Sequence, residues 1–171
     1  MHGGTRAHVR WVPPPDGLFK INTDDAVSKH NQRGAVACVC RDSTGAFLGA
    51  SAMVFDGLIN PEVLETIACS EALALAEDMH IAKPWVASDC LNVIKEINEG
   101  GSNGQQCMIV KQILLKKDQF LEAKFSHERR EANGDAHRLA RSATTLDTGR
   151  HVWFSDPPSE LGVVVNILNN Q

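Results

Sequence analysis

Acidic side chains stand at the ends of several predicted elements, where they could hold a divalent cation. Asp24 and Asp25 end a predicted strand, Glu65 lies in the first turns of a predicted helix, and Asp89 follows another strand. In open α/β sheets, ligands gather at the carboxyl ends of strands. Carboxylates brought together repel one another unless cations hold them, and hard oxygen ligands select Mg²⁺ or Mn²⁺. The pattern therefore predicts a divalent-cation site, and a pair of such ions about 4 Å apart is the usual device for phosphodiester hydrolysis.

Each acid also has a purely structural interpretation. Asp25 suits a turn, Glu65 is favoured by the helix dipole near a helix start, and Asp89 is a natural N-cap. Taken singly, each acid is better explained by these roles. Only their convergence at one end of a sheet indicates chemistry.

The elements that must position these acids follow from hydrophobic periodicity. Strands are expected at residues 19–26, 34–41, 46–55, 83–88 and 120–127, and helices at 60–79, 90–97, 105–117 and 133–144. Short links between the first three strands favour antiparallel hairpins, whereas helices separate the later strands. The order predicts an α/β fold with a mixed five-stranded sheet, in which three antiparallel hairpin strands are followed by two parallel strands. Helices should cover both faces of the sheet.

The first predicted helix has clear start and packing signals. Asn60 is suited to the N-cap and Pro61 to the first helical position. Ala68, Ala72 and Ala76 form a stripe of small side chains. We expect this stripe to let the helix lie close against the sheet.

Length and composition indicate one globular domain. The 171 residues fit a flexible segment at 1–10 and a single domain at 11–171, whose C-terminal tail around residues 156–168 docks on the core. The five cysteines have no zinc-ligand spacing, which indicates free thiols in a reducing compartment, either nucleus or cytoplasm. No apolar segment is long enough for a membrane span, and we expect a monomer. Because the net charge is −4, any nucleic-acid binding must be local or mediated by metal ions.

Five blocks of sequence, in the same order as the predicted elements, resemble plant-type RNase H-like domains. These domains occur as stand-alone proteins and as tails of non-LTR retrotransposon polyproteins. The first block is W-x-P-P-P-x-G-x-x-K-x-N-x-D at residues 11–24. The others are GAVACVCRDSTG (34–45), ETIACSEALALA (65–76), SDCLNVI (88–94) and HERREANGDAHRLA (127–140). The resemblance covers about residues 11–168 and implies an RNase H-like fold.

The resemblance also implies an activity, namely metal-dependent endonucleolytic hydrolysis of the RNA strand in RNA–DNA hybrids. By resemblance, Asp24, Glu65 and Asp89 take the places of the core metal-binding carboxylates. His127 matches a loop histidine that assists proton transfer or product release, although a strand-end histidine needs no such role. The implied cofactor is Mg²⁺, with Mn²⁺ as the alternative.

The fourth acidic position of the family nucleases is His137 in this chain. By resemblance, we keep His137 in the catalytic and metal-binding set. Imidazole is a poor ligand for Mg²⁺ and a better one for transition metals, so we expect modest activity. Asp135 lies two residues away, about 200° around a helix, and therefore cannot simply substitute for the missing acid.

The expected partner is an RNA–DNA hybrid or another nucleic acid. The candidate contacts are Asn22, Lys111, Arg129, Arg130, Asn133 and Arg138. The arginines flank the proposed metal corner and suit backbone phosphates, whereas Lys111 also fits a solvated helix face.

Two other functions remain in view. A catalytically degenerate module that binds nucleic acid or a protein partner is favoured by the acidic net charge and by His137. A phospho-acceptor domain would also use paired acids after a first strand. The opening hairpins argue against that function, because such domains need an all-parallel doubly wound sheet.

Overall fold

Six strands form one mixed sheet in the order β5-β4-β1-β2-β3-β6. The computed structural model describes residues 11–101 and 103–161 of the chain. The strands are β1 (Phe19–Ser28), β2 (Arg33–Arg41), β3 (Phe47–Asp56), β4 (Pro84–Ser88), β5 (Lys124–His127) and β6 (Gly149–Trp153). The antiparallel pairs β1–β2 and β2–β3 and the parallel pairs β1–β4 and β4–β5 confirm the predicted mixed topology.

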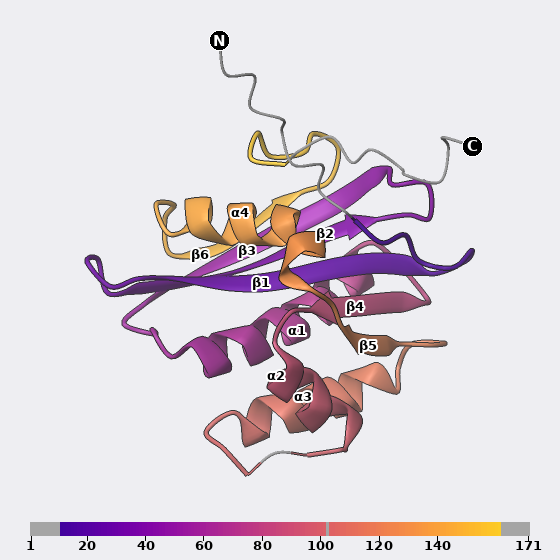
Figure 1. Cartoon of the computed structure of the whole chain (residues 1–171), viewed down its shortest axis with the longest axis horizontal. Coiled ribbons are helices and arrows are strands. Elements are labelled where there is room, and N and C mark those ends of the chain that lie inside the picture. The colour runs from indigo at the N-terminus through magenta and orange to yellow at the C-terminus, as the bar shows by residue number, and fades with distance from the viewer. Residues whose placement is uncertain (1–10, 102, 162–171) are drawn as a thin grey trace.

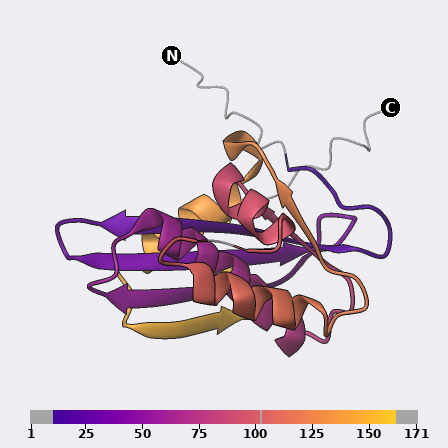
Figure 2. The same ribbon diagram turned by 90° about the horizontal axis from the view of Figure 1, so that it is seen from below.

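Helices cover both faces of the sheet, as predicted. They are α1 (Pro61–Asp78), α2 (Leu91–Asn98), α3 (Cys107–Lys117) and α4 (Gly134–Ala143), with a short 3₁₀ turn, η1 (Arg130–Ala132), before α4. Figure 1 shows α1, α2 and α3 on one side of the sheet and α4 on the other. Seen from below, α3 lies in front of α1, and α1 packs on the sheet (Figure 2). The larger hydrophobic core lies on the α1 side, and a smaller one joins α4 to β2 and β3.

Three strands differ from the sequence prediction, and the first is β1, which continues to Ser28 rather than ending at residue 26. β5 begins at Lys124 rather than at residue 120, because the chain after α3 turns back on itself through Gln119 and Phe120. The sixth strand, β6, was not predicted, and it pairs antiparallel with β3 at the edge of the sheet. Its glycine and its partly exposed side chains give no strong alternating pattern.

The first helix starts and packs as its sequence predicts. The Asn60 side chain accepts a hydrogen bond from the Val63 N–H at 3.1 Å, and Pro61 occupies the first turn. Ala68, Ala72 and Ala76 are fully buried. This close packing holds Glu65, which is on the same helix, near the centre of the sheet.

The register of β1 against its neighbours creates the edge that positions the acids. The last β1–β4 pair is Thr23 with Ser88, whereas β1 continues alongside β2 to Ser28. Asp24 and Asp25 therefore lie just beyond the end of β4, beside Asp89. β5 ends at the same level, where His127 pairs with Ser88.

Parts of the domain prediction lie outside the described residues. These are the segment 1–10 and the part of the C-terminal tail from residue 162 onward. The beginning of the tail does contact the core, since Leu161 packs against the smaller hydrophobic cluster and Glu160 accepts a hydrogen bond from Arg138. Within the described chain, no helix has both the length and the apolar composition that crossing a membrane requires.

Candidate metal and nucleic-acid site

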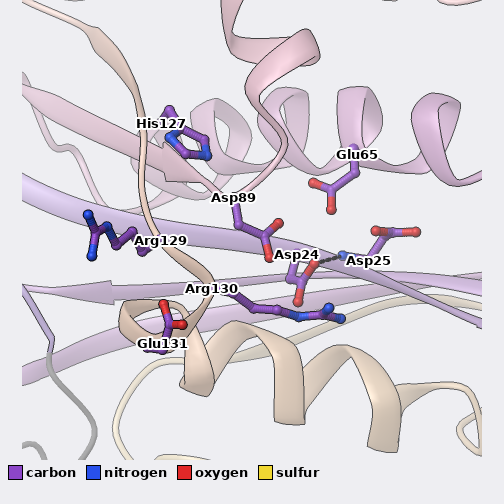
Figure 3. Close-up of a pocket in the computed structure, with 8 residues that line it drawn as sticks. All are labelled: Asp24, Asp25, Glu65, Asp89, His127, Arg129, Arg130 and Glu131. Carbon is purple, nitrogen blue, oxygen red and sulfur yellow. Dashed lines mark hydrogen bonds between the residues drawn. The ribbon is translucent and has the colours of Figure 1, made fainter.

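One open cavity of about 650 Å³ is lined by five acids, and four of them, from three parts of the fold, face one another. Asp24 and Asp25 come from β1, Glu65 from α1, and Asp89 from the turn after β4 (Figure 3). The predicted convergence of Asp24, Glu65 and Asp89 is therefore present. The N-cap of α2 is Cys90, whose N–H bonds to the Ser88 hydroxyl at 3.1 Å, so the Asp89 side chain is not used as the predicted cap.

Three of these acids form a tight group of oxygen atoms. One carboxylate oxygen each from Asp24, Asp25 and Glu65 lies within 4.8 Å of the other two. Asp25, for which the sequence also suited a turn, is a paired strand residue in the structure. β1 in fact continues to Ser28, and strand alternation turns Asp25 toward α1 and Glu65, while Asp24 faces α4.

The crowded acids hold protons more tightly than ordinary carboxylates. Burial is the largest cause that raises the pKa of Glu65, and the neighbouring Asp25 raises it further. Burial also raises the pKa of Asp25 and the pKa of Asp89. The negative charge of Asp24 raises both pKa values further. Arg130 partly opposes the rise at Asp89. The site therefore has more negative charge than its own side chains neutralise.

His137 contacts an acid directly. Its Nδ1 lies 2.9 Å from Oδ2 of Asp24. The same Asp24 side chain accepts the Asp25 N–H at 2.9 Å through Oδ1. His137 is thus a partner of Asp24, and it is not one of the three residues of the tight group of oxygen atoms.

Exposed basic side chains border the acids. His127, Arg129 and Arg130 line the same cavity, together with the exposed Glu131 (Figure 3). They follow one another along the segment that leaves β5 and enters η1. Their charge suits the phosphates of a nucleic acid lying across the acid cluster.

Two predicted nucleic-acid contacts are wrong, because the structure buries them. Asn22 is 3 % exposed and Asn133 is 1 % exposed. Asn22 Nδ2 donates to Asn133 Oδ1 at 3.0 Å, and Asn133 Nδ2 donates to the Thr23 carbonyl at 2.8 Å. Asn133 occupies the N-cap position of α4, but its side chain makes no cap hydrogen bond. The two asparagines thus connect the start of α4 to β1 beside Asp24.

Two other predicted contacts lie away from the cavity lining. Arg138 donates to Asp135 Oδ1 at 2.7 Å and to the Glu160 carbonyl at 3.1 Å. Asp135 is also paired with Arg41 at 2.9 Å, which keeps it from replacing an acid at position 137. Lys111 is exposed on α3 and is not part of the cavity lining.

The acids fit a hard divalent cation better than any other ligand class. Carboxylate oxygens are the donors that Mg²⁺ and Mn²⁺ prefer. The three residues of the tight group come from β1 and α1, two rigid elements, and Asp24 and Glu65 are almost fully buried. The raised pKa values of Asp25 and Glu65 reflect a negative charge that a bound cation would neutralise.

A sequence-family comparison agrees with this arrangement. The family model described as reverse transcriptase-like matches residues 22–143, which include all four acids. No curated protein sequence is significantly similar to the chain.

Solved structures share the fold at low sequence identity. RNase H1 from the halophilic archaeon Halobacterium salinarum is 18 % identical, with a TM-score of 0.62, over 74 % of this chain and 96 % of that one. The N-terminal RNase H domain of Rv2228c from Mycobacterium tuberculosis is 18 % identical, with a TM-score of 0.66, over 74 % and 93 %. LC11-RNase H1, isolated from compost by a metagenomic approach, was solved with an RNA/DNA hybrid. It is 18 % identical, with a TM-score of 0.64, over 72 % and 94 %.

Proposed function

The chain belongs to the reverse transcriptase-like family and has the RNase H-like fold, and from this premise we propose that it hydrolyses the RNA strand of RNA–DNA hybrids with a divalent cation. The observation that carries the proposal is the group of Asp24, Asp25 and Glu65 oxygens within 4.8 Å, in a cavity bordered by basic side chains. LC11-RNase H1, which shares the fold, was solved with such a hybrid.

Asp24, Asp25 and Glu65 are the residues that would hold the cation, with Asp89 completing the negative lining of the cavity. Mg²⁺ is the proposed ion and Mn²⁺ the alternative; when bound, it polarises the scissile phosphate and lowers the pKa of the attacking water. Asp24 is held in place by two contacts, from the Asp25 N–H and from His137.

The basic side chains have separate proposed roles. Arg129 and Arg130, both exposed, bind backbone phosphates and orient the strand toward the acids. His127, exposed at the end of β5, gives a proton to the leaving oxygen or takes one from water. The ribose 2′-hydroxyl distinguishes the RNA strand from the DNA strand.

A non-catalytic module that binds nucleic acid is the second candidate. The observation in its favour is that the α4 position nearest Asp24 carries His137, an imidazole already engaged with that acid. In this case Arg129 and Arg130 would still bind the backbone, but no strand would be cut.

One cleavage experiment separates the two candidates. A labelled RNA–DNA hybrid is incubated with Mg²⁺ or Mn²⁺ and the wild-type protein, the Asp24→Asn variant, or Asp118→Asn, a control in an exposed aspartate at the end of α3. We expect cleavage by the wild type and the control, and a loss of at least about 100-fold in Asp24→Asn, since the electrostatic effect of a bound ion is several kcal/mol. Cleavage unchanged by Asp24→Asn would remove the acid cluster from the reaction. Hybrid binding without cleavage by the wild type would favour the module.

A further inference from the structure

A second polar cluster is buried beside the acids, and the proposed reaction does not use it. It consists of Lys20 (1 % exposed), Asn22 (3 %), Glu128 (9 %) and Asn133 (1 %). Buried polar groups are costly unless they are paired, so a buried cluster of this size needs an explanation.

Glu128 is the centre of this cluster. Its Oε1 accepts a hydrogen bond from Lys20 Nζ, and its Oε2 accepts one from Asn22 Nδ2 at 2.6 Å. Asn22 connects onward to Asn133, which donates to the carbonyl of Thr23, the residue before Asp24. The segment between β5 and α4 is therefore joined to β1 by side-chain contacts at both of its ends.

Lys20 joins a third segment to the same point. Its Nζ donates to the Val12 carbonyl at 2.6 Å and lies 5.7 Å from the centre of the Trp11 ring and 5.1 Å from that of Trp85. The Trp11 indole N–H also donates to Asn22 Oδ1 at 3.2 Å. A cation held against two aromatic faces and one carboxylate fixes its partners in a single arrangement.

The position of Glu128 in the sequence gives this cluster a consequence for the site. Glu128 lies between His127 and Arg129, and Arg130 follows. The Glu128 side chain is buried against Lys20 and Asn22. His127, Arg129 and Arg130 are exposed and line the cavity with the acids (Figure 3). Anchoring Glu128 thus fixes the backbone from which all three basic side chains extend.

We propose that Glu128, held by Lys20 and Asn22, is a positioning residue that places His127, Arg129 and Arg130 so that a nucleic-acid backbone is bound across the acid cluster. This inference rests on the proposed function, because it gives the three basic side chains a nucleic-acid ligand. Glu128 touches neither substrate nor cation in this scheme and acts only through its neighbours.

A purely electrostatic role for Glu128 and a positioning role predict opposite changes in nucleic-acid affinity when its charge is removed. Removing a negative charge near a phosphate-binding surface should strengthen nucleic-acid binding. Loss of the Glu128 anchor should weaken binding, because Arg129 and Arg130 are no longer held in place. The matched control is Glu131→Gln, which makes the same chemical change at an exposed residue of the same cavity.

The experiment measures the affinity for a labelled RNA–DNA hybrid in EDTA at several salt concentrations, using the wild type, Glu128→Gln and Glu131→Gln. Mg²⁺ affinity is measured separately by calorimetry, and unfolding curves identify the folded variants. We expect Glu128→Gln to bind the hybrid about tenfold more weakly, with the slope of log K against log salt reduced by about 1, as for one lost phosphate contact. Its Mg²⁺ affinity should stay that of the wild type, and Glu131→Gln should bind the hybrid at least as tightly as the wild type.

Glu128→Asp is the second variant, in case Glu128→Gln does not fold. It keeps the charge pair with Lys20 but shortens the anchor by one methylene, so we expect it to fold and to bind the hybrid several-fold more weakly. Hybrid binding equal to wild type in a folded Glu128 variant would overturn the positioning role, and so would a parallel loss of Mg²⁺ affinity. Failure of the wild type itself to bind the hybrid both in EDTA and with Mg²⁺ would overturn the proposed function, and this inference with it.

Discussion

Two buried polar clusters lie next to each other along β1, and they differ in how their charges are met. Around Lys20 and Glu128, one cation faces one anion, and the neighbouring asparagines supply the remaining donors and acceptors. Around Asp24, carboxylates from β1 and α1 face one another. Asp89 is close enough that the negative charges of Asp24 and Asp25 raise its pKa. The first cluster is balanced within the protein, and the second is not.

This difference indicates the role of each cluster. A balanced cluster has nothing left to offer a ligand, and it stabilises one arrangement of the segments that it joins. An unbalanced cluster of acids stays buried only at a cost in free energy, which protons or a cation from outside can remove. The protein therefore places a fixed region directly beside a region that is completed by binding.

The largest expected effect comes from unbalancing the first cluster. Glu128→Ala would leave Lys20 buried without its anionic partner, and breaking such a pair costs about 3–5 kcal/mol of unfolding free energy. Glu131→Ala, at the exposed neighbour, should change stability by no more than about 0.5 kcal/mol. Urea unfolding of both variants measures the two values. A loss below about 1 kcal/mol in Glu128→Ala would mean that the pair does not hold this region together.

The next effect concerns the pH dependence of the unbalanced cluster in the metal-free protein. The pKa values of Asp25, Glu65 and Asp89 are raised by burial and by their neighbours. Above pH 4, where an unfolded chain releases these protons, the native state still holds them, so stability falls as the pH rises toward the raised pKa values. We therefore expect the free energy of unfolding to decrease from pH 5 to pH 8 in EDTA.

Chemical denaturation at each pH measures this loss, and Asp24→Asn serves as its control. That variant removes one charge from the cluster, so its stability should fall less steeply with pH. Added Mg²⁺ should restore the stability of the wild type at pH 8 more than at pH 5. A wild-type stability that rises over this range would contradict the account.

The smallest expected effect comes from adding an acid at position 137. His137 is on α4 and contacts Asp24. An aspartate at position 137 would offer another hard oxygen ligand to a cation. If the lack of this ligand limits the reaction, His137→Asp should raise Mg²⁺-supported hybrid cleavage about fivefold, equivalent to about 1 kcal/mol. Single-turnover rates in Mg²⁺ and in Mn²⁺ test this expectation. A flat or lower rate would mean that the position does not limit the cation site.

The sequence predicted the positions of the helices and strands better than the details of the site. Hydrophobic periodicity, the Asn60–Pro61 helix start and the short hairpin links were enough to place the five strands from β1 to β5 and all four α-helices, because these signals are local. β6 was missed, since an edge strand with one exposed face needs little alternation. Its pairing with β3 depends on a long-range contact.

The site residues that local sequence signals mark were predicted, whereas those that depend on long-range contacts were not. The convergence of Asp24, Glu65 and Asp89 followed from strand ends and from family resemblance, and the cavity contains all three. Asp25 was named among the acids at the strand end but was left out of the predicted metal ligands, because the family resemblance matches only Asp24 of this pair. The burial of Asn22 and Asn133 could not be predicted, because polar side chains are assigned to the surface unless their buried partners are known. Those partners lie more than 100 residues apart in the chain.

The central claim is that the unbalanced acid cluster binds a divalent cation, and a calorimetric titration with Mg²⁺ tests it most directly. We expect Mg²⁺ binding to the wild type that saturates below about 10 mM, within reach of protein sites for hard cations, and loss of this binding in Asp24→Asn. The control Asp118→Asn should bind as the wild type does. Absence of binding by the wild type up to that concentration, or equal binding by Asp24→Asn, would contradict the claim.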